Sequence, residues 1–432
     1  MDAPMKHKIV QRRWLRWLMG TAGFFVFLTL LVGWLNVRGE MPLDSGAPDT
    51  AMPDPVRVER GAYLARAGNC MGCHSTAGAP EFAGGRRMET PFGTVITPNI
   101  TQDTGTGIGS WSAAEFWRAM HHGRSKNGRL LYPAFPYPSY TLVTREDSDA
   151  LYAYLRTVKP VVQANKAHAL AFPYNTQAAL AVWRALFFRP GTLPPEPQKT
   201  AEWNRGRYLV DGLAHCAACH SSRNALGATG LNAEFAGGLM PDETWYAPSL
   251  TSPNEAGLQK WSRVEAVNLL KNGVARHATV SGPMAEVVYN STQHLTKQDL
   301  NAMVEYLASL PVRESDKSEA PRAYSNVLGR GAKIYEQQCV ACHGDKGQGV
   351  ASIYPALAGN RAVLLDSTNN LVQTIRNGGF SPSTAGNPRP FGMPPFAQVL
   401  NNDDIAAVTS FVRQSWGNAA PAVSPLDVHR VK

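Results

Sequence analysis

The hydrophobic pattern of the chain begins with one long uncharged stretch. Residues 17–35 read WLMGTAGFFVFLTLLVGWL, and a helix of these 19 residues is long enough to cross a bilayer. Segment 1–16 is basic, so the positive-inside rule predicts that it is cytoplasmic and that the rest of the chain is exported. A cleaved signal sequence is the alternative, but the stretch is longer than a usual signal core and the following NVRGEMPL has no obvious A-x-A site.

Beyond this stretch, short amphipathic segments recur in the same order three times. Each copy starts with an R-G-x-x-[LI] segment that leads into two cysteines: RGAYLARAGNCMGCH at 60–74, RGRYLVDGLAHCAACH at 205–220 and RGAKIYEQQCVACH at 330–343. Helices that stop at a glycine are predicted at 112–123, 263–273 and 370–379. Closing amphipathic helices are predicted at 145–158, 296–310 and 402–416.

Polar, proline-bearing stretches separate the copies and predict the domain boundaries. A chain of 432 residues is also too long for one compact core. The expected order is a cytoplasmic segment at 1–16, a membrane anchor or signal sequence at 17–35, a linker at 36–56, a first domain at 57–165, an apolar connecting segment with a proline-rich linker at 166–200, a second domain at 201–312, a linker at 313–322, a third domain at 323–417 and a tail at 418–432.

All six cysteines fall in C-x-x-C-H, the attachment signature of c-type haem: Cys70, Cys73 and His74; Cys216, Cys219 and His220; Cys339, Cys342 and His343. Two thiols on one helical face can bind one porphyrin, and the histidine that follows can ligate its iron. Zinc sites would need further ligand pairs, and no cysteines remain to supply them. The sequence therefore predicts three covalently bound haem c groups. The predicted fold is all-α, with three tandem cytochrome c domains after one N-terminal transmembrane helix.

A methionine is the usual sixth ligand of a high-potential haem, and two of the copies offer one. Met284 follows a Gly-Pro pair, and Met393 stands in Gly-Met-Pro-Pro. We expect both in irregular segments before the closing helix, where a loop can present sulfur to iron. Met303 is the competing candidate in the second domain, but it lies inside an amphipathic segment that is predicted to be core.

The first copy has no methionine at the corresponding position. Alignment on the glycines places Phe135, in LLYPAFPYPSY, where Met284 and Met393 stand, and phenylalanine cannot coordinate iron. Met120 is favoured as its replacement, although it could simply pack on the porphyrin. His121, His122 and Met88 are also candidates, and an open or water-bound iron is the remaining possibility.

Two further features bear on partners. The formal net charge is +9, of which segment 1–16 contributes +4 from five basic residues and one acidic residue. Haem propionates would offset much of the remainder, and no basic stripe interleaved with aromatics indicates nucleic acid. The apolar segment FPYNTQAALAVWRALFFRP at 172–190 is expected to be a connecting helix on the first domain. Its alternative is a surface that docks a partner subunit or lies against the bilayer.

The combined motifs resemble one family. The three C-x-x-C-H copies, TPFGTVITPNITQDTGTGIGSW at 90–111, LYPAFPYPSY and GPMAEVV are similar to the tri-haem cytochrome c subunit of bacterial membrane-bound dehydrogenases, over residues 57 to 416. The resemblance implies an inner-membrane protein with one N-terminal anchor and its haem domains in the periplasm. It implies electron transfer from a catalytic subunit of molybdenum, PQQ or flavin type to ubiquinone or a terminal oxidase. A small iron–sulfur or accessory subunit is a further candidate partner.

Phe135 departs from the alcohol and sugar dehydrogenase members of this family, which carry the ligand methionine there. The Ala-Phe-Pro-Tyr version resembles cytochromes that accompany molybdenum-containing aldehyde or N-heterocycle oxidoreductases, which favours an aldehyde-type partner. The chain has no nucleotide-binding glycine loop, nucleophile elbow or flavin signature, so we expect no substrate chemistry of its own. The alternatives are an enzyme that works at an open first haem, such as a peroxidase or reductase, and a free-standing shuttle cytochrome.

Overall fold

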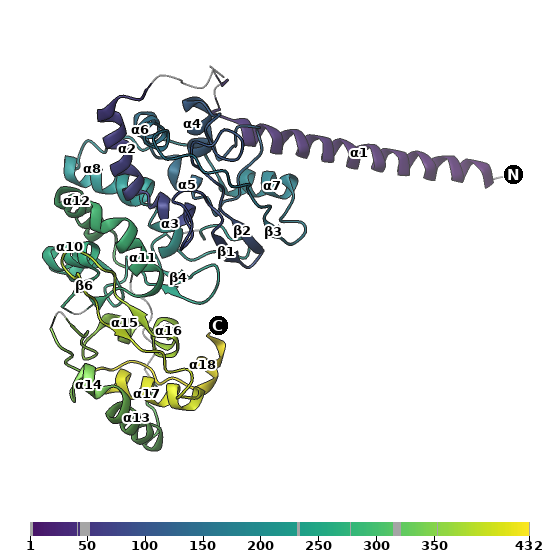
Figure 1. Cartoon of the computed structure of the whole chain (residues 1–432). Coiled ribbons are helices and arrows are strands. Elements are labelled where there is room, and N and C mark those ends of the chain that lie inside the picture. The colour runs from purple at the N-terminus through teal and green to yellow at the C-terminus, as the bar shows by residue number, and fades with distance from the viewer. Residues whose placement is uncertain are drawn as a thin grey trace.

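The computed structural model describes residues 3–40, 42–43, 52–230, 234–276, 278–313, 321–351 and 353–431. A long helix, α1 (Ala3–Val37), projects from the body, which consists of three helical repeats arranged in chain order (Figure 1). We refer to residues 55–155, 201–308 and 325–414 as the first, second and third repeats. The first repeat lies at the base of α1, and the third lies at the far end of the body.

Each repeat is built around the crossing of its first and last helices. The pairs are α2 (Pro55–Ala67) with α6 (Arg145–Leu155), α8 (Ala201–Arg207) with α12 (Lys297–Ala308), and α13 (Ser325–Gln338) with α17 (Asn402–Gln414). The glycine of each R-G pair lies at the crossing. A β-carbon at Gly61, Gly206 or Gly331 would overlap the carbonyl oxygen of Ala150, Ala302 or Ala407 respectively. Glycine is therefore required for the two helices to approach so closely.

The arginine of the same R-G pair binds the start of the last helix. In the first repeat, Arg60 Nε donates to Asp147 Oδ1 at 2.7 Å. The corresponding distances are 2.9 Å from Arg205 Nε to Asp299 Oδ1 and 2.9 Å from Arg330 Nε to Asp404 Oδ1. The repeated sequence signature thus encodes a helix pair and its ion pair.

The helices between these pairs carry the cysteine motifs and the predicted glycine stops. The motif helices are α3 (Cys70–His74), α9 (Ala217–His220) and α14 (Val340–His343). The glycine-ended helices are confirmed as α4 (Ala113–His122), α10 (Arg263–Asn272) and α16 (Asn369–Asn377). The remaining helices are α5 (Tyr137–Tyr140), α7 (Gln177–Phe187), α11 (Gly282–Asn290), α15 (Arg361–Leu364), α18 (Pro425–Arg430) and the 3₁₀ turns η2 (Leu258–Lys260) and η3 (Thr292–His294).

The second repeat contains a π-helix, η1 (Tyr208–Leu213), directly before its cysteines. Eleven positions separate Arg205 from Cys216, whereas ten separate Arg60 from Cys70. A π-helical turn absorbs one extra residue without ending the helix. The insertion is therefore accommodated without shifting the cysteine motif away from the helix crossing.

Helices predominate, but an all-α description leaves out four small antiparallel sheets in the described part of the chain. One has three strands, β1 (Arg87–Thr90), β2 (Gly93–Ile96) and β3 (Ala169–Leu170). The others are two-residue pairs: β4 (Gly238–Leu239) with β5 (Tyr246–Ala247), β6 (Val274–Ala275) with β7 (Ala278–Thr279), and β8 (Gly379–Phe380) with β9 (Gly392–Met393). Strands this short give no alternating pattern that a sequence could reveal.

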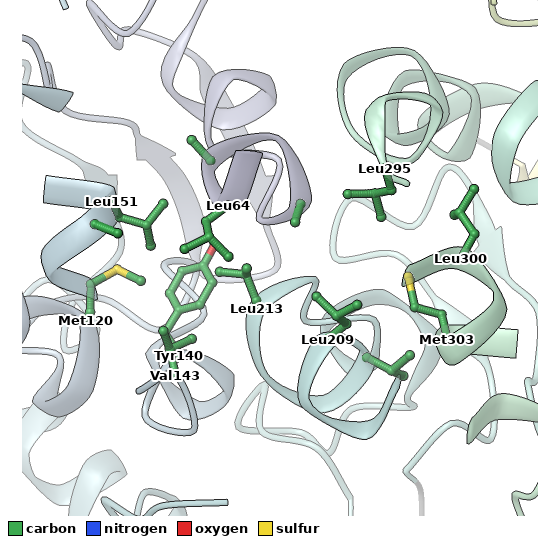
Figure 2. Close-up of a cluster of buried hydrophobic side chains, with 14 of the residues drawn as sticks. Leu64, Met120, Tyr140, Val143, Leu151, Leu209, Leu213, Leu295, Leu300 and Met303 are labelled. Carbon is green, nitrogen blue, oxygen red and sulfur yellow. The ribbon is translucent and has the colours of Figure 1, made fainter. Parts of the chain in front are cut away.

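The first and second repeats share one hydrophobic core. Figure 2 shows Leu64, Met120 and Leu151 of the first repeat in the same cluster as Leu209 and Met303 of the second. The third repeat has a separate core, whose fully buried members include Val372 and Ile405. The first two repeats are therefore one packing unit.

Two tyrosines join the first two repeats reciprocally. Tyr63 Oη donates to Asp299 Oδ2 and Tyr208 Oη donates to Asp147 Oδ2, both at 2.6 Å. Each tyrosine is the third residue after its motif arginine, and each bound aspartate also pairs with the arginine of its own repeat. The interface is thus pseudo-twofold. The third repeat has Lys333 at the corresponding position and takes no part in it.

The third repeat contacts the second mainly through polar side chains. The Asn370 amide both accepts from the backbone N–H of Tyr246 and donates to its carbonyl, each at 2.8 Å. Arg361 donates to the carbonyl of Pro253 at 2.9 Å and lies over the ring of Trp261. Such a junction resembles an interface between separate domains.

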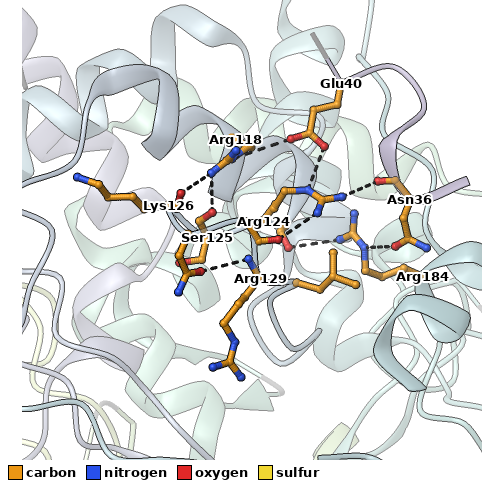
Figure 3. Close-up of polar contacts among 12 residues, drawn as sticks. Asn36, Glu40, Arg118, Arg124, Ser125, Lys126, Arg129 and Arg184 are labelled. Carbon is orange, nitrogen blue, oxygen red and sulfur yellow. Dashed lines mark hydrogen bonds and ion pairs between the residues drawn. The ribbon is translucent and has the colours of Figure 1, made fainter. Parts of the chain in front are cut away.

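The end of α1 is bonded directly to the first repeat (Figure 3). Asn36 donates to the Ala181 carbonyl in α7 and accepts from Arg184 Nε, each at 2.9 Å. Arg124 donates to the Asn36 carbonyl at 3.0 Å and pairs with Glu40 at 3.0 Å. The predicted linker therefore begins later than residue 36, because α1 continues to Val37. The apolar connecting segment forms α7, which packs against α1 as well as the first repeat.

The helix crossing in the third repeat can be tested within one helix. Gly331→Ala should lower the free energy of unfolding by about 1–3 kcal/mol, because the new methyl group overlaps the Ala407 carbonyl and Phe411. Gly329→Ala, also in α13, is the matched control, because a β-carbon there meets no atom within 4 Å. The control should be neutral or stabilising by up to about 1 kcal/mol. Denaturant unfolding followed by circular dichroism measures both, and equal effects would contradict the crossing.

Candidate functional site: three haem-attachment motifs

Each cysteine motif forms a short helix at the end of the first helix of its repeat. All six cysteines are free and partly buried. Burial raises the pKa of Cys70 and of Cys216 to about 12, so these thiols stay protonated. Zinc requires thiolates, and the described part of the chain holds no group of three or more His, Cys, Asp or Glu side chains arranged for a metal ion. Each motif thus presents two free, partly buried thiols that are available for covalent attachment.

The histidine of each motif is oriented by a proline carbonyl. The Nδ1 atoms of His74, His220 and His343 lie 2.8, 2.7 and 3.0 Å from the carbonyl oxygens of Pro98, Pro248 and Pro355 respectively. A carbonyl accepts only, so Nδ1 carries the proton and Nε2 is left to bind a metal. Burial also lowers the pKa of all three imidazoles, which favours the neutral, ligating form.

Sequence reasoning missed these three prolines. They follow their histidines by 24, 28 and 12 residues, so no constant spacing marks them. The signal that could have found them is the presence of a proline in the loop after every motif. The fold brings that loop back to the histidine each time, although the loops differ in length.

The sites of the first and second repeats are joined by α11, which carries Met284. This helix packs against α3, the cysteine motif helix of the first repeat. Arg86 connects them, because its guanidinium donates both to the Gly72 carbonyl in α3 and to the Glu286 carboxylate in α11. The second Arg86–Glu286 hydrogen bond is 2.8 Å long. Arg86 and α11 thus connect the cysteine motif of the first repeat with the segment that carries Met284.

The structure corrects the expected surroundings of both candidate methionine ligands. Met284 lies in the first turn of α11, and not in an irregular segment, because Pro283 suits the start of a helix as well as a turn. Met393 lies in β9, where its backbone is paired with Gly379. Both side chains are half-buried. Met303 is 2 % exposed in the shared core, as predicted.

Phe135 occupies the place in the first repeat that Met284 occupies in the second. The Gly123 carbonyl accepts from Leu131 N–H at 2.8 Å, and the Gly273 carbonyl accepts from Val280 N–H at 2.9 Å. Phe135 and Met284 each follow that anchored residue by four positions. The Phe135 ring packs against Tyr140, with ring centroids 5.3 Å apart. An aromatic pair thus stands where the second repeat presents a thioether.

The four replacement candidates lie in different surroundings. Met120 points into the shared core near Leu151, and Cys70 packs against the same cluster (Figure 2). Met88 lies in β1, paired with Val95. Met120 thus belongs to the cluster against which Cys70 packs, and its ligation of iron stays a prediction.

The two histidines of α4 lie in other surroundings. His121 stacks on Trp117, with ring centroids 4.3 Å apart, and burial lowers its pKa to about 4. Burial also lowers the pKa of His122 to about 4, and Arg184, Arg124 and Arg118 add to the effect. These are the arginines that surround the end of α1.

Comparison with known proteins identifies the family of each repeat. A model of the cytochrome c family matches residues 58–159, 204–311 and 328–416. The chain belongs to the cytochrome c family. It is 39% identical over 399 residues to the cytochrome c subunit of an alcohol dehydrogenase (quinone) from Gluconacetobacter polyoxogenes, covering 88% of this chain and 85% of that protein. It is 38% identical over 403 residues to a gluconate 2-dehydrogenase cytochrome c subunit from Pantoea cypripedii, covering 89% and 91%.

A third relative is much longer than this chain. It is a subunit of nicotinate dehydrogenase from Pseudomonas putida, 38% identical over 433 residues, which cover 98% of this chain but 35% of that protein. All three relatives are named as subunits of dehydrogenases, and two of them are named as cytochrome c subunits.

Family membership implies covalent haem c, and three cysteine pairs are consistent with three such groups. The residues present fit this cofactor. Each motif offers two free thiols within a short helix or at its N-cap, and each histidine uses Nδ1 for a proline carbonyl and keeps Nε2 for iron. The donor set is the one that c-type haem requires.

The candidate sixth ligands predict a spectroscopic change. Met284→Leu and Met393→Leu should each create one additional haem per chain that binds carbon monoxide in the reduced state, because leucine cannot ligate iron. Met303→Leu is the matched control and should add none, since Met303 is a core residue. Met120→Leu tests the first repeat in the same way. If Met284→Leu bound no more carbon monoxide than the control, that assignment would be wrong.

The buried histidines predict a pH dependence of stability. The pKa of His122 is about 4 in the folded chain against an ordinary value of 6.5, so the unfolded chain binds more protons between these values. The contribution of His122 to stability is complete above pH 6.5 and is lost as the pH falls toward 4. His122→Gln should therefore flatten the loss of unfolding free energy across this window. The exposed His429→Gln is the control, and equal slopes for both variants would refute the assignment.

Proposed function

We propose that this cytochrome c passes electrons from a periplasmic dehydrogenase subunit to ubiquinone or a terminal oxidase. The observation that carries the proposal is the threefold recurrence of a cysteine motif helix whose histidine is held by a proline carbonyl. When bound, c-type haem supplies reversible one-electron chemistry of iron. Nine residues hold the three groups: Cys70, Cys73 and His74; Cys216, Cys219 and His220; and Cys339, Cys342 and His343.

The chain itself positions and insulates these sites. Met284 and Met393 are the proposed sixth ligands in the second and third repeats, and Met120 is the proposed one in the first. The shared core and the Arg86–Glu286 bridge hold the first two sites at a fixed separation. The second repeat contacts both neighbours, which supports a linear order of sites with the second in the middle.

We infer a partner of the molybdenum type that oxidises an aldehyde or an N-heterocycle, with alcohol and sugar dehydrogenases as alternatives. Two features support this choice. Phe135 stands in the slot of the missing methionine, and the relative named as a nicotinate dehydrogenase subunit matches 98% of this chain. Substrate chemistry then belongs to the partner, and this chain conducts the electrons.

We also propose that α1 is a retained anchor in the inner membrane, with the repeats in the periplasm. The window Trp14–Val37 is long and apolar enough to cross a bilayer, with a mean hydropathy of 2.0 and none of it buried. The bonds that Asn36 and Glu40 make with Arg118, Arg124 and Arg184 support retention. Cleavage near residue 40 would remove the Asn36 side chain that accepts from Arg184 Nε, and Arg184 is only 3 % exposed.

A second candidate function is small-molecule chemistry at the first site. Phe135 favours it, since no residue in that slot can ligate iron. If the unaltered protein bound carbon monoxide at one haem per chain, this alternative would gain support. Absence of carbon monoxide binding at every haem would remove it.

Purification from membranes tests the proposed function. The chain should co-purify with a catalytic dehydrogenase subunit, and its mass should exceed that of the polypeptide by three haem groups. The complex should reduce a ubiquinone analogue with the substrate of the partner. His74→Ala is expected to remove one absorbing haem without preventing partner binding, because the motif lies inside the first repeat. A colourless chain, or a chain recovered alone as a soluble shuttle, would overturn the proposal.

A further inference from the structure

The outer face of α7 is apolar although it lies at the surface. Ala178, Val182 and Leu186 recur every four residues along it and are exposed, Val182 by 48% and Leu186 by 61%. The one charged residue of α7, Arg184, is 3 % exposed and faces inward. A surface helix in water normally carries charged or polar residues on its outer face. This face therefore has the character of a contact surface.

Neighbouring segments extend this apolar face. Phe172 and Tyr174, just before α7, are 81% and 37% exposed, and Phe187 at the end of α7 is 37% exposed. Leu226 of the second repeat, 46% exposed, lies beside α7 because its carbonyl accepts from the Trp183 indole at 2.9 Å. We refer to these residues as the apolar patch: Phe172, Tyr174, Val182, Leu186, Phe187 and Leu226.

The position of α1 indicates what covers the patch. Asn36 lies in the last turn of the membrane-length helix and is hydrogen-bonded to Ala181 in the middle of α7. In Figure 1, α1 leaves the body on the side where α7 lies. Asn36 stands at the end of the apolar stretch of α1, so α7, which is bonded to it, lies at the level where that stretch would leave the hydrocarbon core. The interface of the bilayer lies at this level.

Several hydrogen bonds and an ion pair hold the end of α1 against the body. Arg124 and Arg184 bind the backbone and side chain of Asn36, and Glu40 pairs with Arg124. Arg38 adds a hydrogen bond of 3.0 Å to the Phe188 carbonyl at the end of α7. The end of α1 and α7 are thus joined by several hydrogen bonds.

We propose that the apolar patch lies in the interfacial layer of the bilayer that α1 spans, so that the body contacts the membrane beside α1 as well as through it. Amphipathic helices of this kind bury their apolar face by about 5–10 Å in the boundary between headgroups and acyl chains. The inference rests on the proposed retention of α1. It deepens the proposed function, because a quinone dissolved in the bilayer would then meet the first two repeats before the third.

Nitroxide labels on the full chain in lipid nanodiscs of phosphatidylethanolamine and phosphatidylglycerol test the proposal. Once haem occupies the six native cysteines, Leu186→Cys offers one free thiol for the label. Phe25→Cys in α1 is the positive control for lipid, and Val264→Cys in α10 is the control for water. Val264 is 69% exposed, and α10 lies on the side of the body away from α1. Unchanged haem absorbance checks folding.

The accessibility of each label to oxygen is compared with its accessibility to a water-soluble nickel chelate. The ratio of oxygen accessibility to chelate accessibility at position 186 should exceed the same ratio at position 264 several-fold and approach the ratio at position 25. A ratio at 186 equal to that at 264, with lipid values at 25, overturns the apolar patch while the anchor stands. Water values at all three positions overturn the anchor itself. Shielding at 186 that appears only when the partner subunit is present would assign the patch to that subunit and also overturn the proposal.

Discussion

The close crossing of the first and last helices in each repeat is the contact on which the rest of the structure depends. It joins segments far apart in the sequence, since Arg60 and Asp147 are 87 residues apart. The cysteine motif leaves the end of the first helix, so its orientation follows from the crossing. Glycine allows the backbones to touch, and the arginine neutralises an aspartate that is 2 % exposed in the first repeat. An unpaired carboxylate at that depth would be strongly destabilising.

Asp147 and Asp299 also accept hydrogen bonds from the neighbouring repeat. This second contact distinguishes the first two repeats from the third. Tyr63 and Tyr208 use these aspartates to bind the first two repeats to each other, and the shared core completes that unit. The third repeat has Lys333 in place of tyrosine at the corresponding position. That repeat has its own core and contacts the second through amides and an arginine. Separating it from the second repeat would therefore expose less buried apolar surface than separating the first two repeats from each other.

Local signals were readable from the sequence, whereas contacts made by folded loops were not. The glycine stops and the cysteine motifs are local, and the helices form where those signals predict. The surroundings of Met284 were predicted wrongly, because Gly-Pro marks a turn and a helix start equally well. The proline carbonyls behind His74 and its two counterparts were missed, since the loops that return them have unrelated lengths. Tyr63 and Asp299 are 236 residues apart, so their hydrogen bond leaves no local trace.

The arginine-lined junction at the base of α1 also bears on how the protein can be produced. Three guanidinium groups there converge on Asn36 and Glu40, and one of them is almost fully enclosed. A secreted version that started after residue 40 would lose Glu40, the carboxylate that pairs with Arg118 and Arg124. Any soluble fragment intended for crystallisation or electrochemistry should therefore keep the last turn of α1 and Glu40. The apolar part of α1 before that turn should be removed or replaced by polar residues.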